Sequence, residues 1–139
     1  MNNQMQNILS YTKSTSLLYV EDNEEARGFT LELLNRFFDN ISVAINGQEG
    51  LELFNTKKFD LIITDINMPV MGGMEMIRKI RTIDIKIPIF ILSAHNEAAY
   101  LEASNNISIC EYLEKPLNLK ELIDTLDKIS MNMKKDSIS

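Results

Sequence analysis

The chain has 139 residues, 45% of them apolar and 24% charged, a balance typical of one globular domain rather than of a disordered chain. The formal net charge of −6 argues against a non-specific grip on nucleic acid or on an anionic membrane surface. A single cysteine, Cys110, excludes an intrachain disulfide and fits a reducing, cytoplasmic setting. No apolar run approaches the roughly 20 residues that a membrane-spanning helix requires, so no membrane segment is expected.

Short apolar runs alternate along the chain with segments of helical periodicity. Five of these runs predict β-strands, at residues 16–20, 41–45, 60–64, 87–92 and 107–113. Capping residues and apolar stripes predict five helices, at residues 23–37, 46–54, 73–83, 96–103 and 118–129. This alternation predicts an α/β fold, a doubly wound parallel sheet of five strands with helices on both faces. The polar segment 1–14 is expected to be a mobile tail or a frayed helix, and residues 131–139 a fraying tail.

The chain is organised around the third predicted strand, whose apolar residues end at a lone carboxylate, Asp65. Pro69 prevents this strand from continuing because it has no backbone N–H for the sheet. Gly72 and Gly73 allow a tight turn before the next helix. In open α/β sheets, functional groups lie beyond the carboxyl ends of the strands. Asp65 therefore stands where a reactive group is expected.

Polar residues follow three other predicted strands as well. Glu21 and Asp22 follow the first, Ser93 the fourth and Lys115 the fifth. Three neighbouring carboxylates repel one another unless a cation lies among them, and Mg²⁺ is a hard cation that binds carboxylate and phosphoryl oxygens. Lys115 and Ser93 would add a positive charge and a hydroxyl donor at the same edge. This set predicts an aspartate equipped to attack phosphorus and to carry an acyl phosphate.

Four motifs, in this order and at these strand ends, resemble those of the response-regulator receiver domains of two-component signalling, over residues 15–130. The motifs are Glu21-Asp22, Asp65-Ile66-Asn67-Met68-Pro69 with Gly73 downstream, Leu92-Ser93-Ala94, and Tyr112-Leu113-Glu114-Lys115-Pro116. The resemblance implies the flavodoxin-like receiver fold, with strand order 2-1-3-4-5. It also implies that Asp65 is the phospho-acceptor, and that the phosphohistidine of a sensor histidine kinase or phosphotransfer protein is the donor. Glu21, in place of the more frequent aspartate, is a small departure from the family pattern.

The resemblance assigns a role to each residue around Asp65. Mg²⁺ would be bound by Asp22, Asp65 and the backbone carbonyl of Asn67, with Glu21 acting mostly through water. Lys115 would contact the phosphoryl group. The domain would catalyse only its own phosphorylation and dephosphorylation.

The resemblance also implies a switch. The hydroxyl of Ser93 would move to the phosphoryl oxygen, and the ring of Tyr112 would rotate into the vacated space. The surface that changes would be formed by the helix at 96–103, the strand at 107–113 and the helix at 118–129. The downstream effector is not indicated by the sequence, and direct contact with nucleic acid is not expected. The domain would act as a monomer or as a phosphorylation-dependent dimer.

Three other classes of protein fit the sequence less well. A phosphatase of the haloacid-dehalogenase type would need a second aspartate where Asn67 stands, and usually a cap domain, neither of which the sequence shows. A receiver-like interaction module that is not phosphorylated would be expected to lack one of the acids or the lysine. A dinucleotide-binding fold is excluded because no G-x-G-x-x-G follows the first strand.

Overall fold

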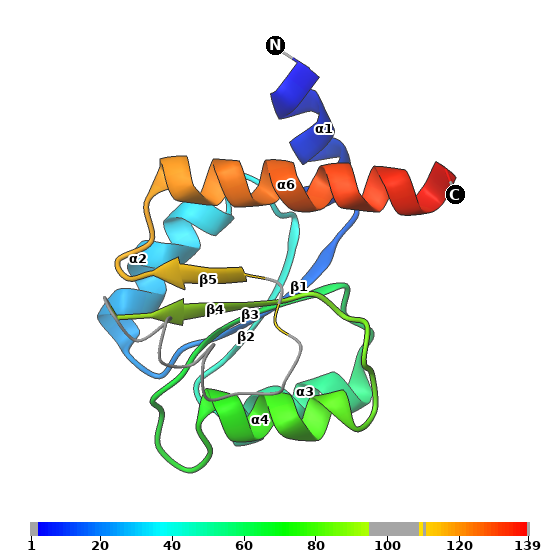
Figure 1. Cartoon of the computed structure of the whole chain (residues 1–139). Helices are drawn as coiled ribbons and strands as arrows, with labels where there is room; N and C mark the ends of the chain where they lie inside the picture. Colours follow the sequence, from blue (N-terminus) through cyan, green and yellow to red (C-terminus); the bar gives the residue numbers. More distant parts are fainter. Residues whose placement is uncertain (1–2, 95–108, 110, 139) are drawn as a thin grey trace.

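The computed structural model describes residues 3–94, 109 and 111–138, with side chains in the last helix described as far as residue 132. At its centre lies a parallel sheet of five strands in the order β2-β1-β3-β4-β5 (Figure 1). The strands are β1 Ser16–Val20, β2 Asn40–Ala44, β3 Leu61–Asp65, β4 Ile89–Ser93 and β5 Glu111–Glu114. The predicted fold class and strand order are confirmed.

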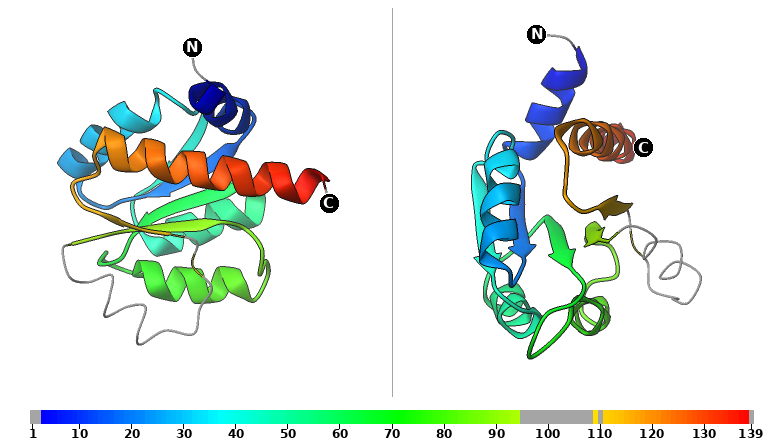
Figure 2. Two further views of the ribbon diagram at one scale, coloured as in Figure 1. Left: turned by 45° about the horizontal axis from the view of Figure 1, so that its top comes forward. Right: turned by 90° about the vertical axis from the view of Figure 1, so that its left-hand side faces the viewer.

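Helices cover both faces of the sheet (Figure 2). The described helices are α1 Asn3–Thr12, α2 Glu24–Leu34, α3 Gly47–Thr56, α4 Gly73–Arg81 and α6 Leu119–Ile138. Helices α2 and α6 pack on one face, and α3 and α4 pack on the other. The helix expected at 96–103 lies outside the described residues, as do residues 107, 108 and 110 of the predicted fifth strand.

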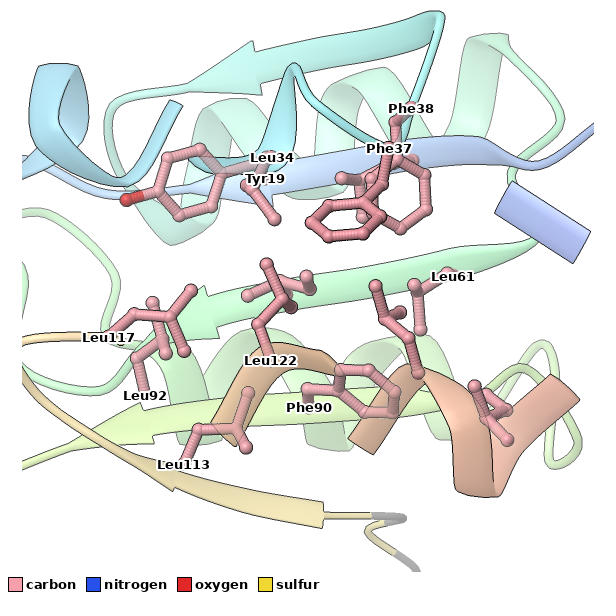
Figure 3. Close-up of a cluster of buried hydrophobic side chains, with 14 of the residues drawn as sticks. Tyr19, Leu34, Phe37, Phe38, Leu61, Phe90, Leu92, Leu113, Leu117 and Leu122 are labelled. Atoms are coloured by element: carbon pink, nitrogen blue, oxygen red, sulfur yellow. The ribbon is translucent and has the colours of Figure 1, made fainter. Parts of the chain in front are cut away.

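The sheet divides the core into two layers because successive side chains of a strand point to opposite faces. Leu17 and Tyr19 of β1 join the cluster beneath α2 and α6 (Figure 3), whereas Leu18 and Val20 join the cluster beneath α3 and α4. All residues of β3 and β4 are buried, since helices cover both of their faces. This explains why these strands are continuous apolar runs rather than alternating patterns.

Of the two alternatives expected for the N-terminal segment, a mobile tail or a frayed helix, the mobile tail is wrong for residues 3–12, which form the helix α1 and pack against α6 (Figure 1). Ile8 is fully buried, in one cluster with Leu126 of α6. The Gln4 side chain also donates a hydrogen bond to Asp127 at 3.3 Å. The polar composition of this segment concealed an apolar stripe at helical spacing, formed by Met5, Ile8 and Leu9.

Helix α6 is longer than the sequence analysis predicted. It continues to Ile138, beyond the expected end near residue 129, so the fraying tail expected from residue 131 is also wrong up to this point. Residues 130–138 contain neither glycine nor proline, so nothing in the chain interrupts the helix there. Within the described part of the chain, no helix combines the length and the apolar character needed to cross a lipid bilayer.

Candidate functional site

Because all five strands run parallel, their carboxyl ends meet at one edge of the sheet (Figure 1). Asp65 is the last residue of β3 and is in register with Leu92 of β4, so Ser93 follows one residue further along the neighbouring strand. Ser93 is in turn in register with Glu114 of β5, which directly precedes Lys115. The strand ends thus bring the predicted site residues to the same edge.

Three carboxylates gather at this edge. One carboxylate oxygen from each of Glu21, Asp22 and Asp65 lies within 4.8 Å of the others. Glu21 is 1% exposed and Asp65 is 8% exposed, whereas Asp22 faces solvent. The N–H of Asn23 donates to Glu21 Oε2 at 3.1 Å, and the N–H of Ile66 donates to Asp65 Oδ1 at 2.8 Å, so both buried carboxylates are held in place. This set of oxygen donors fits a hard divalent cation such as Mg²⁺.

Lys115 places a positive charge directly against two of these carboxylates. Its Nζ lies 3.0 Å from Glu21 Oε1 and 3.2 Å from Asp65 Oδ2. Its backbone N–H donates to the carbonyl oxygen of Ser93 at 2.8 Å, which ties the residue after β5 to the end of β4. The peptide bond between Lys115 and Pro116 is cis. One lysine against three carboxylates leaves an excess of negative charge that would attract a cation.

Burial and neighbouring groups change the pKa values of two residues at this edge, Glu21 and Lys115. Burial raises the pKa of Glu21 above the usual carboxyl value; hydrogen bonds from Lys115 and Asn23 oppose this rise, and the charge of Asp65 adds to it. Burial acts to lower the pKa of Lys115, but the hydrogen bond to Glu21 and the charge of Asp65 outweigh it and raise that pKa. Lys115 is therefore a protonated, partly buried cation at neutral pH.

Ser93, Tyr112 and Asn67 complete the set of predicted site residues. Ser93 is 1% exposed, and among the described residues its Oγ has no hydrogen-bond partner. The ring of Tyr112 on β5 is half-buried against the cluster beneath α3 and α4. Asn67 is exposed, two residues beyond Asp65. The switch role of Ser93 and Tyr112 and the ligand role of the Asn67 carbonyl stay predictions.

The loop after β3 folds back tightly onto the strand end. The N–H of Gly73 donates to the carbonyl oxygen of Ile66 at 2.8 Å. A Cβ at Gly73 would collide with the carbonyl oxygen of Asp65, so only glycine fits there. Neither Gly72 nor Gly73 has a positive φ. The loop therefore needs glycine at this point for space rather than for a left-handed backbone.

Comparison with known proteins assigns this arrangement to a family. The family described as response regulator receiver domain matches residues 17–127. The chain belongs to this family. A response regulator receiver protein from Anaeromyxobacter sp. (strain Fw109-5) is 34% identical over 107 residues, which cover 77% of this chain and 45% of that protein. The autoinducer 1 sensor kinase/phosphatase LuxN from Vibrio campbellii is 32% identical over 116 residues, which cover 84% of this receiver domain and 14% of LuxN.

Solved structures agree with the family. The N-terminal domain of an uncharacterized protein from Wolinella succinogenes is 31% identical, with a TM-score of 0.77 over 89% of this chain and 99% of that one. The chemotaxis response regulator CheY4 of Vibrio cholerae is 27% identical, with a TM-score of 0.73 over 83% of this chain and 98% of that one. The curated relatives named above are longer proteins, and this receiver domain spans less than half of each of them.

Two residues of this receiver domain escaped the sequence analysis. Arg27 of α2 donates a hydrogen bond to the carbonyl oxygen of Glu21, directly behind the acids. The sequence signal for Arg27 was its position, because the helix dipole favours acidic rather than basic residues near the start of a helix. Val70, in the loop after Asp65, has a φ of 68°. A β-branched residue rarely adopts this conformation, so nothing in the local sequence pointed to it.

Proposed function

We propose that Asp65 accepts a phosphoryl group, in a Mg²⁺-dependent reaction, from the phosphohistidine of a sensor histidine kinase or phosphotransfer protein. One observation carries the proposal. The carboxylate of Asp65 lies within 4.8 Å of those of Glu21 and Asp22, while its Oδ2 lies 3.2 Å from Lys115 Nζ. Membership of the receiver family supports the same assignment.

The reaction needs few groups from the protein. A carboxylate oxygen of Asp65 attacks the phosphorus, the P–N bond to the donor histidine breaks, and its electron pair returns to the imidazole nitrogen. The product is an acyl phosphate on Asp65. The hydrogen bond from the N–H of Ile66 keeps the carboxylate oriented for this attack. The ammonium group of Lys115, which pairs with Glu21 and Asp65 before the reaction, can then pair with the negatively charged phosphoryl oxygens.

Mg²⁺ fits the donor set at this edge. The residues that would hold it are the carboxylates of Asp22 and Asp65 and the backbone carbonyl of Asn67, with Glu21 acting mostly through water. The bound ion would supply positive charge for the phosphoryl oxygens. The mutual repulsion of three acids within 4.8 Å of one another supports this assignment, because one lysine offsets only part of their charge.

Phosphorylation would act on the rest of the domain through Ser93 and Tyr112. A phosphoryl group adds roughly −1.5 to −2 charges and three acceptor oxygens. A buried Ser93 hydroxyl without a hydrogen-bond partner among the described residues is a donor ready for such an oxygen. The responding surface would comprise residues 96–103, 107–113 and 118–129, and would bind an effector in the cytoplasm.

Labelling with acetyl phosphate tests the proposal. The wild-type chain with Mg²⁺ is expected to take up label, and Asp65→Asn is expected to take up none while unfolding at a similar denaturant concentration. Asp124→Asn is the matched control, because it removes an exposed carboxylate from α6 and should leave uptake unchanged. Undiminished uptake by Asp65→Asn would refute the assignment of the phospho-acceptor.

A further inference from the structure

Arg27 reaches back from α2 to the loop that carries two of the three acids. Its Nη1 donates to the carbonyl oxygen of Glu21 at 3.0 Å and lies 3.4 Å from the carbonyl oxygen of Asp22. Its own backbone N–H donates to the carbonyl oxygen of Asn23 at 2.9 Å, which fixes Arg27 in the first turns of the helix. The guanidinium therefore contacts the backbone behind the acids.

We propose that Arg27 is a positioning residue, which sets the geometry of the acidic cluster for Mg²⁺ by holding the peptide groups of Glu21 and Asp22. The inference rests on the proposed function of this cluster as a Mg²⁺ site. Each peptide group is planar, so the orientation of its carbonyl fixes the direction in which the chain, and with it the next side chain, continues. Because the same nitrogen, Nη1, contacts both carbonyls, neither of the two adjacent peptide groups can rotate freely without losing its contact with Arg27.

The two acids depend on this contact in different ways. The carboxylate of Glu21 is buried and is held by Lys115 and by the N–H of Asn23. That N–H belongs to the peptide group whose carbonyl Arg27 approaches at Asp22, so the same contact orients the donor to Glu21. Asp22 is exposed, so the orientation of its carboxylate depends mainly on the backbone that carries it.

A purely electrostatic role for Arg27 makes the opposite prediction. A positive charge near a cation site weakens cation binding, so removing the charge alone would tighten the binding of Mg²⁺. Loss of positioning would weaken it, because partners that orient metal ligands typically contribute about tenfold or more to affinity. The sign of the change in the Mg²⁺ dissociation constant therefore separates the two roles.

Titration of the full chain with MgCl₂ in a calorimeter tests the proposal. Arg27→Met is expected to raise the Mg²⁺ Kd about tenfold. Arg27→Lys is also expected to raise it, because lysine keeps the charge but its shorter side chain cannot place Nζ where Arg27 Nη1 contacts both carbonyls. The matched control is Arg36→Met, which removes an exposed arginine just beyond the other end of α2 and should leave the Kd within about twofold of wild type.

A second measurement needs no metal. Amide hydrogen exchange at Asn23 in the metal-free chain should accelerate in Arg27→Met and stay unchanged in Arg36→Met, at equal global stability. A wild-type chain that fails to bind Mg²⁺ would overturn the proposed function of the cluster. Wild-type binding combined with equal or tighter binding in Arg27→Met, or with unchanged exchange at Asn23, would overturn the role of Arg27 alone. If Arg27→Met does not fold, Arg27→Lys decides in both measurements.

Discussion

The two ends of the parallel sheet differ in how they accommodate acidic side chains. At the amino end, Asp60 Oδ2 accepts the N–H of Ser16 at 2.9 Å. Asp84 Oδ1, in the loop before β4, accepts the N–H groups of Lys86 and Ile87 at 2.8 Å and 3.0 Å. Such hydrogen bonds, from a backbone N–H to a charged carboxylate, stabilise the loop segments that carry the donor and the acceptor. The acids of the amino end therefore support the fold.

The carboxyl end contains features that cost stability. Glu21 is buried, with its pKa raised by that burial. The hydroxyl of Ser93 is buried without a hydrogen-bond partner among the described residues. Val70 has a φ of 68° within a turn closed by a hydrogen bond from the N–H of Met71 to the carbonyl oxygen of Pro69. Each of these features is unfavourable in the free protein.

The contrast shows where this receiver domain gives up stability. Groups that are poorly satisfied in the free protein can gain interactions when a cation or a phosphoryl group arrives, whereas groups that are already satisfied cannot. Only interactions that differ between two states can shift the balance between them. A buried acid, an unsatisfied hydroxyl and a strained turn close to one another at the carboxyl end are the pattern expected of a site that gains interactions when it is occupied.

The largest expected effect tests how rigidly the carboxyl end is built. Gly73→Ala should lower the free energy of unfolding by about 3 kcal/mol, because the new Cβ collides with the carbonyl oxygen of Asp65 and neither backbone can move without disturbing β3. Urea denaturation measures the change. A loss below about 1 kcal/mol would mean that the loop after β3 is free to shift.

Gly28→Ala is the matched control for this substitution. Gly28 lies within α2, and a Cβ there would meet no atom within 4 Å. Alanine has a higher helix propensity than glycine, so this variant should gain about 1 kcal/mol. Opposite signs for the two variants would separate the steric requirement at Gly73 from any general effect of replacing glycine.

Addition of Mg²⁺ is the next largest expected effect. Free Mg²⁺ at one hundred times its Kd should raise the free energy of unfolding of the wild-type chain by about 2.7 kcal/mol, since the ion binds the folded chain. Asp22→Asn should lose most of this increment without losing stability in the absence of the metal, because one of three mutually repelling carboxylates has been removed.

The amino end provides the contrasting variant. Asp60→Asn should lose about 1 kcal/mol in the absence of Mg²⁺, because the bond from the N–H of Ser16 is weakened, and should keep the full Mg²⁺ increment. Thermal or urea unfolding with and without Mg²⁺ measures all three chains. Equal increments in Asp22→Asn and Asp60→Asn would contradict the distinction between the two ends.

The sequence predicted the sheet and the acids because both follow from short-range rules. Continuous apolar runs such as that of β3 predict buried parallel strands, and a carboxylate directly after such a run must lie at the edge of the sheet. Asp65, Glu21 and Lys115 were predicted in this way, and the structure brings them within ion-pair distance.

The sequence could not predict features that depend on contacts between distant segments. Helix α1 is stabilised by packing of Ile8 against α6, more than a hundred residues away, so its polar composition alone suggested a mobile tail or a frayed helix. The contact of Arg27 with the carbonyl of Glu21 depends on the angle at which α2 leaves β1. The positive φ of Val70 contradicts the intrinsic preference of valine and is imposed by the loop around it.

The last expected effect concerns Val70. This residue is 81% exposed, so replacing its side chain removes little packing. Val70→Asn should raise the free energy of unfolding by about 1 kcal/mol, because asparagine tolerates a positive φ far better than a β-branched residue does. Urea denaturation of the metal-free chain measures the gain.

Ile85→Asn is the matched control, because Ile85 is 73% exposed in the loop before β4, at the amino end, and does not have a positive φ. This variant should change stability by no more than about 0.5 kcal/mol. A gain confined to Val70→Asn would locate backbone strain at the carboxyl end. Equal changes in the two variants would show instead that exposed apolar side chains, and not the backbone of this turn, account for the difference.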